Sequence, residues 1–183
     1  MRIKNNENAY GIVAIVFHWL MAVAVIAMFA LGLWMDSLDY YDAWYKQAPH
    51  IHKSIGILLV CVWILRLSWR QFNIKPGPLV THTPFERRAA KWTHRILYLL
   101  LILLMFSGYM ISTADGRAID VFNWFAVPAS GLQIDNQEDI AGEIHEILAW
   151  LVIIVASVHA AAALKHHFFD KDATLRRILR ISK

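Results

Sequence analysis

The sequence has a single cysteine and few charged residues for a chain of 183 residues. With Cys61 alone, no disulfide can form within the chain, which excludes a small secreted fold held by disulfides. Charged residues make up 17%, against about 25% in soluble proteins, and the 58% of hydrophobic residues excludes intrinsic disorder. The net charge of +4 would suit nucleic acid, but a soluble nucleic-acid-binding domain does not contain apolar runs of about 20 residues. The composition therefore predicts an integral membrane protein.

Four apolar segments are candidates for crossing about 30 Å of hydrocarbon, which takes about 20 apolar residues. We expect helices over about residues 11–35, 50–70, 92–112 and 143–166. The second is the weakest, because it spans only if His52 and Arg66 both lie inside the helix, and a re-entrant segment is the alternative. The first run is too long for the apolar core of a signal peptide, about 7–15 residues, so we expect a retained first helix.

The basic residues are distributed asymmetrically. With four spans, the termini and the middle loop share one side of the membrane, and all but Lys46, Lys53 and Arg117 of the 18 basic residues lie on that side. An excess of Lys and Arg marks the cytoplasmic side. We therefore predict one all-α domain over residues 1–183, a four-helix membrane bundle with both termini cytoplasmic. The basic C-terminal tail, which includes Arg180 and Lys183, is expected on anionic lipid headgroups.

The loops on the opposite side are acidic, with nine Asp or Glu residues against three basic ones. They also hold aromatic residues, among them Trp44, Phe122 and Trp124, which suit a membrane interface. We expect a short helix lying on the membrane over Ala118–Val127.

Nine histidines is a high number for this length, and an ionisable side chain inside a membrane usually has a functional partner. Five lie near ends of the expected helices, His18, His52, His94, His145 and His159, whereas His50 and His82 are expected in loops. His145 and His159 are fourteen residues apart, and fourteen steps of 100° end about 40° short of four turns. They therefore project from nearly one helix face, about 21 Å apart along the axis. His52 and His18 fall at the two matching depths.

The same spacing recurs on the other helices. Gly32 and Gly108 lie fourteen residues after the histidines of the first and third helices. Small residues in membrane helices usually serve helix packing, but here they would also leave room for a large flat group. Arg66 lies fourteen residues after the histidine of the second helix, where a carboxylate such as a haem propionate would stabilise its charge.

Two haems, each with two axial histidines, account for this pattern, because iron accepts imidazole at both axial positions. The absence of a C-x-x-C-H motif excludes covalent c-type attachment, so the haems would be b-type. Zinc fits less well, because it needs three or four clustered ligands. His94 is ambiguous: it could replace His18 as a ligand or face a propionate or a quinone. A haem-free bundle that scaffolds or transports is a further alternative.

At these histidines the chain resembles the bacterial cytochrome b561 family of four-helix, two-haem quinone oxidoreductases. The resemblance covers essentially the whole chain. It rests on the strings FHWL (His18), HIHKSIG (His52), HRILYLLL (His94), IHEILAWL (His145) and HAAAALKHHFF (His159 to Phe169), of which the last is the most specific.

The resemblance implies that His18 and His159 ligate a cytoplasmic haem b, and that His52 and His145 ligate a periplasmic one. It also implies a quinone site beside the cytoplasmic haem, at His166, to which we add Arg66 and His94.

The implied function is electron transfer across the bacterial inner membrane between a periplasmic one-electron donor and quinone, as part of a respiratory chain. Stand-alone members of the family oxidise superoxide and reduce ubiquinone. Acidic outer loops disfavour an anion and suit a basic electron-transfer protein instead. The alternative is an anchor subunit that carries electrons for a periplasmic hydrogenase or dehydrogenase.

Overall fold

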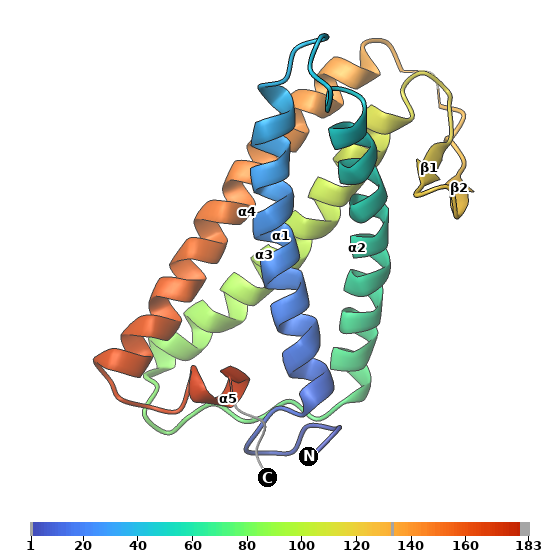
Figure 1. Cartoon of the computed structure of the whole chain (residues 1–183). Helices are drawn as coiled ribbons and strands as arrows, with labels where there is room; N and C mark the ends of the chain where they lie inside the picture. Colours follow the sequence, from blue (N-terminus) through green and yellow to red (C-terminus); the bar gives the residue numbers. More distant parts are fainter. Residues whose placement is uncertain (1, 133, 180–183) are drawn as a thin grey trace. The chain divides into compact units, whose positions relative to one another are not determined.

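The computed structural model describes residues 2–132 and 134–179, so Arg180 and Lys183 lie outside the described residues. Figure 1 shows four long helices, α1 (Ile12–Asp36), α2 (Gln47–Phe72), α3 (Pro84–Ser112) and α4 (Gln137–Phe168), and a short α5 (Arg176–Leu179). Each long helix is long and apolar enough to cross a membrane, which confirms the four expected segments. The second is one continuous helix of 26 residues that contains both His52 and Arg66, so the re-entrant alternative is wrong.

Local capping explains why α3 begins eight residues before the predicted start. The Thr83 hydroxyl accepts a hydrogen bond from the Glu86 amide at 3.2 Å, and the Glu86 carboxylate accepts one from the Thr83 amide at 2.9 Å. This reciprocal pair is a capping box, and Pro84 stands at the first helical position, where proline is favoured. The helix therefore starts at this polar cap, before the apolar run from which its start was predicted.

The long helices leave most of their apolar side chains uncovered. Val23 is 63% exposed, Ile26 62% and Val158 63%, and at most 11% of any candidate span is buried inside the protein. Exposure of apolar surface on this scale marks a face that contacts lipid or another protein. The helices are thus compatible with a membrane helical bundle.

The chain divides into two compact units. Unit 1 consists of the described residues within Met1–Ala22, Val62–Leu99 and Val152–Lys183, and unit 2 consists of Val23–Cys61 and Leu100–Leu151 without residue 133. Each long helix therefore contributes one part to unit 1 and the other part to unit 2.

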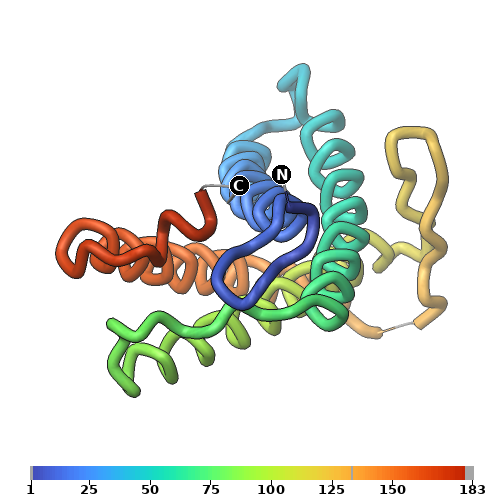
Figure 2. Tube along the Cα trace, turned by 90° about the horizontal axis from the view of Figure 1, so that it is seen from below, coloured from blue at the N-terminus to red at the C-terminus, as the bar shows by residue number. Residues whose placement is uncertain are grey.

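In unit 1 the chain's N-terminal segment lies against the loop between α2 and α3 (Figure 2). Asn5 donates to the carbonyl of Ile74 at 2.9 Å, and the amide of Gly77 donates to the carbonyl of Glu7 at 2.9 Å. From the other end of the chain, Arg177 donates to the Gly77 carbonyl at 2.7 Å. Arg177 is thus held by protein, whereas the location of the basic tail on lipid headgroups stays a prediction.

Unit 2 contains a small β-hairpin where a surface helix was expected. Strands β1 (Ile119–Val121) and β2 (Phe125–Val127) pair antiparallel, with Val121 opposite Phe125. Phe122 and Asn123 in the turn have φ values of 50° and 58°, and two positive φ values are typical of tight hairpin turns. The prediction of a helix over Ala118–Val127 is therefore wrong. The period-two burial of β1, with Ile119 and Val121 inside, is the reason.

His50 also lies elsewhere than predicted. It is part of α2, which begins at Gln47, and its Nε2 atom is 4.0 Å from the Asp120 carboxylate of the hairpin. Ser54, one turn further along α2, donates to the Asp120 carbonyl at 3.3 Å and accepts from the Phe122 amide at 3.2 Å. These contacts fix the hairpin against the start of α2.

Candidate functional site

In unit 2, His52 of α2 faces His145 of α4. The centroids of the two imidazole rings are 6.2 Å apart, and the ring planes are inclined by 70°. Glycines of α1 and α3 allow this placement. A Cβ atom on Gly32 would lie 3.5 Å from Cε1 of His52, and one on Gly108 would lie 3.1 Å from Cε1 of His145. The predicted small residues therefore border the histidine pair.

Hydrogen bonding determines which nitrogen of His145 is free. Its Nδ1 atom is 3.0 Å from the backbone carbonyl of Leu104 and 3.0 Å from the hydroxyl of Ser107. A carbonyl can only accept, and the Ser107 hydroxyl also donates to Leu104, so Nδ1 carries the proton. Nε2 is then the unprotonated nitrogen that can bind a metal, in the arrangement usual for metal-ligating histidines.

His52 has a buried nitrogen without a partner. Its Nδ1 atom forms no hydrogen bond with the residues that the structure describes. An orphaned buried nitrogen in a native structure requires an explanation, such as a site for a cofactor or an ion.

Unit 1 contains an equivalent pair. The ring centroids of His18 in α1 and His159 in α4 are 6.4 Å apart, with an interplanar angle of 69°. The guanidinium of Arg66 donates to Nδ1 of His18 at 3.1 Å. Because arginine cannot accept a hydrogen bond, Nδ1 of His18 is the acceptor in this arrangement.

His94 lies beside the same pair, but at a different spacing. Its ring centroid is 5.1 Å from that of His159. Arg66 and Arg70 both lie over the face of the Tyr98 ring, with guanidinium carbons 5.4 and 5.0 Å from its centroid. The structure therefore brings His18, Arg66, His94 and His159 together in unit 1.

The ring separations test whether the pairs fit a metal bound between them. A metal–nitrogen bond of about 2.0 Å and a ring radius of about 1.1 Å would place the centroids of two imidazoles on opposite sides of a metal roughly 6.2 Å apart. The observed 6.2 and 6.4 Å match this value, whereas 5.1 Å between His94 and His159 is too short. Within the described ranges, the clusters of three metal donors both contain His166 and none of the paired histidines, so the pairs suit an axially ligated haem better than zinc.

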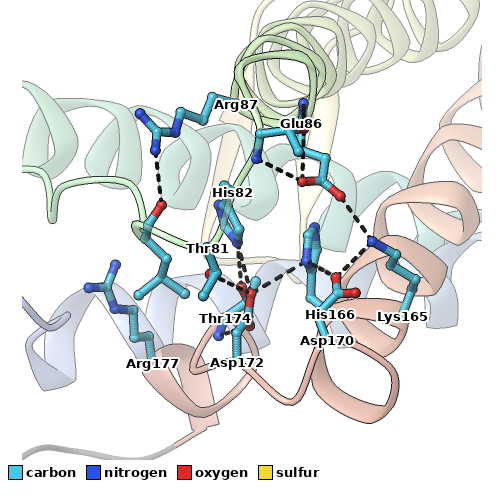
Figure 3. Close-up of polar contacts among 12 residues, drawn as sticks. Thr81, His82, Glu86, Arg87, Lys165, His166, Asp170, Asp172, Thr174 and Arg177 are labelled. Atoms are coloured by element: carbon cyan, nitrogen blue, oxygen red, sulfur yellow. Dashed lines mark hydrogen bonds and ion pairs between the residues drawn. The ribbon is translucent and has the colours of Figure 1, made fainter.

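His166, near the end of α4, lies in a polar cluster of unit 1 (Figure 3). Its Nδ1 atom is 2.7 Å from the Asp170 carboxylate and 3.4 Å from that of Asp172, and its ring centroid is 4.5 Å from that of His82. His82 lies in a loop, as expected. Its contacts with Asp172 were not expected, because a loop histidine has no periodicity that indicates its partner.

Ser107 is a second residue that the sequence reasoning missed. A metal-ligating histidine usually donates its other ring nitrogen to an acceptor, so a partner could be expected. The sequence does not say which helix supplies that partner, because the contact joins residues 38 positions apart.

Paired, half-buried imidazoles on long apolar helices are what a membrane-bound b-type cytochrome requires. The chain belongs to the prokaryotic cytochrome b561 family, whose model matches residues 9–180. It is 51% identical to cytochrome b561 homolog 2 of Escherichia coli K12, over 98% of this chain and 95% of that protein. It is 28% identical to the probable superoxide oxidase CybB of Yersinia pestis, over 94% and 97%. It is 26% identical to cytochrome b562 of Cereibacter sphaeroides, over 95% and 97%.

Membership of this family confirms the resemblance of the sequence strings. The protein is a multi-pass inner-membrane cytochrome of a family that binds haem b and transfers electrons across the membrane.

Proposed function

We propose that the protein binds two b haems and carries single electrons between a periplasmic donor and a quinone on the cytoplasmic side. His18 and His159 hold one haem, and His52 and His145 hold the other. The observation that carries this proposal is the separation of the ring centroids, 6.4 and 6.2 Å, in the two pairs. When bound, each haem supplies a one-electron carrier whose potential depends on its axial ligands and surroundings.

The residues around each pair have distinct tasks. Leu104 and Ser107 hold His145 in the tautomer whose Nε2 is unprotonated and can act as a ligand. Gly32 and Gly108 let their helices approach the ligand rings without a Cβ atom in between. Arg66 offers a half-buried guanidinium, which is suited to binding a carboxylate such as a propionate. When His18 binds a metal through Nε2, its Nδ1 carries the proton and cannot accept a hydrogen bond from Arg66. The guanidinium of Arg66 is then free to bind the carboxylate.

We place the quinone site in unit 1, on the cytoplasmic side, as the positive-inside rule orients the chain. His166 is the proposed principal contact, and we add Arg66 and His94, which lie beside the pair of His18 and His159. Each of these side chains can donate a hydrogen bond to a quinone carbonyl. His94 is assigned here and not to the iron because its spacing to His159 is too short for a trans pair.

Superoxide is the donor that the Yersinia relative's name suggests, and electrostatics restricts where it can approach. The outer loops are acidic, and an anion is repelled from a negative surface. Lys53, next to His52 in α2, and Arg117, which forms an ion pair with Asp115, are among the few outer cations. A basic redox protein is the second candidate donor, favoured by the same acidic loops.

The first experiment is a reduced-minus-oxidised spectrum combined with a haem-to-protein ratio. We expect two haems per chain, one after His52→Ala and one after His18→Ala, with His50→Ala as the control that keeps both. Loss of a haem in His94→Ala with both retained in His18→Ala would overturn the ligand assignment. For the donor, quinone reduction is followed under a superoxide flux. A rate no higher than that of haem-depleted protein excludes superoxide.

A further inference from the structure

Unit 1 also brings together three side chains with metal-donor atoms, none of which belongs to the two histidine pairs. This group joins the loop before α3 to the segment after α4 (Figure 3). The Asp172 carboxylate oxygen Oδ2 is 3.1 Å from Nε2 of His82 and 3.4 Å from Nδ1 of His166. All three donor atoms lie within 4.8 Å of one another.

The group is buried, and its carboxylate is oriented by the protein. The side chain of Asp172 is 2% exposed, that of His166 12% and that of His82 15%. Oδ1 of Asp172 accepts a hydrogen bond from the Thr174 amide at 2.7 Å, which directs Oδ2 towards the two imidazoles. A buried carboxylate normally needs a cation or several donors, and here both imidazoles lie beside the same oxygen.

One nitrogen in the group is not satisfied. Nδ1 of His166 is buried and makes no hydrogen bond within the described part of the chain, although carboxylate oxygens lie 2.7 and 3.4 Å away. This nitrogen lies close to two carboxylates but outside hydrogen-bond geometry. A histidine that binds a cation lying between these groups would be placed in the same way.

A neighbouring group with the same histidine is already neutralised. Glu86, His166 and Asp170 also bring three donor atoms together. The Lys165 ammonium, however, is 2.9 Å from the Glu86 carboxylate and 2.7 Å from the Asp170 carboxylate. This lysine supplies the cation that those two acids need. No lysine or arginine of the described residues pairs with Asp172, whose carboxylate contacts the two histidines and the threonines Thr81 and Thr174.

We propose that His82, His166 and Asp172 form a binding site for a divalent transition-metal cation of the zinc type. Ligands about 2.0–2.1 Å from a tetrahedral zinc ion are roughly 3.3 Å apart, close to the 3.1 and 3.4 Å found here. Two imidazoles and one carboxylate suit this class of metal and leave a position for water. The Thr174 hydroxyl, 3.0 Å from Nε2 of His82, can hydrogen-bond to that water.

A cation at this site would tie the segment after α4 to the loop before α3. His166 is also the quinone contact proposed above, and a metal on Nδ1 leaves its Nε2–H as a donor. The metal proposal itself rests on neither haem nor quinone.

The test uses the purified haem-loaded protein, freed of its purification tag, stripped with a chelator and titrated with zinc chloride alone. We expect one zinc ion per chain by calorimetry and by metal analysis after desalting. His82→Ala and Asp172→Asn should each weaken binding by at least about tenfold, since each removes one of three ligands. His50→Ala, which alters another histidine near an aspartate, and His167→Ala, next to the site, should bind zinc as the wild type does.

Hydrogen exchange gives an independent readout of where zinc binds. Zinc should slow exchange in residues 172–179 of the wild type and leave exchange in Asp172→Asn unchanged. Equal zinc binding by wild type and both site variants, or no stoichiometric binding, would overturn the proposal. The haem spectrum of each variant serves as the folding control. If His82→Ala or Asp172→Asn loses zinc binding but retains both haems, the zinc site is supported independently of the function proposed above.

Discussion

Gly108→Ala tests whether His145 is a haem ligand held at a fixed position. The added Cβ atom would lie 3.1 Å from Cε1 and 3.4 Å from Nδ1 of His145. The closer contact is tighter than ordinary van der Waals contact, so the ring must move by a few tenths of an ångström. The ring resists this movement because Nδ1 is hydrogen-bonded to the Leu104 carbonyl on the same helix as Gly108.

The expected cost follows from two opposed effects. Overpacking a fixed site costs about 1–3 kcal/mol. Replacing glycine by alanine inside a helix contributes about 1 kcal/mol in the opposite direction. Gly142→Ala isolates the second effect, because a Cβ atom there meets no described residue within 4 Å. The stability of Gly108→Ala should therefore fall below that of Gly142→Ala by about 1–3 kcal/mol.

The assay compares the two variants by haem content, potentiometric titration and low-temperature electron paramagnetic resonance. Gly108→Ala should shift or weaken the signals of one haem and leave the other unchanged, because the contact is confined to unit 2. Gly142→Ala should match the wild type. Identical haem content, potentials and resonance in both variants would refute the placement of His145 against an occupied haem.

Three further predictions concern hydrogen bonds and charge. Ser107→Ala should weaken the binding free energy of one haem by only about 0.5–1.5 kcal/mol, as followed by its release on heating, because the Leu104 carbonyl still orients His145. Complete loss of that haem would contradict this prediction. His94→Ala should keep both haems but raise the KM for quinone, and an unchanged KM removes His94 from the quinone site. A hydrogen bond from Arg117 lowers the pKa of Asp115. The Asp115–Arg117 pair therefore stabilises the loop fully above the ordinary aspartate pKa, and this stabilisation is lost as the pH falls through the lowered pKa. In Arg117→Ala the carboxyl resonance should titrate nearer the ordinary pKa, and an unchanged titration contradicts the pairing.

The histidine pattern could be predicted because it follows from helix geometry alone. Two residues fourteen positions apart on one helix share a face wherever the helix packs. The four apolar segments could also be predicted, because the thickness of the hydrocarbon sets the length of a membrane span. The family resemblance supplied which histidines pair, and the ring separations support the same pairs.

The hairpin, the start of α3 and the contact between two loops could not be predicted from helix periodicity. The aromatic residues of 118–127 suit a membrane interface and favour a helix lying on it. Strands of only three residues each are too short for their alternation to indicate a hairpin in the sequence. The start of α3 lies in a polar capping box outside the apolar run. The contact between His82 and Asp172 joins residues 90 positions apart, and no periodic pattern relates two loops.

The partners of the histidines also determine where protons can be exchanged. The carbonyl of Leu104 accepts a hydrogen bond from His145 but cannot take up its proton. His166 instead lies beside the carboxylates of Asp170 and Asp172, a type of group that can carry a proton, as a carbonyl cannot. Under the proposed function, electrons and protons would be handled at different histidines, so single-electron steps could be paired with the two protons that a quinone takes up.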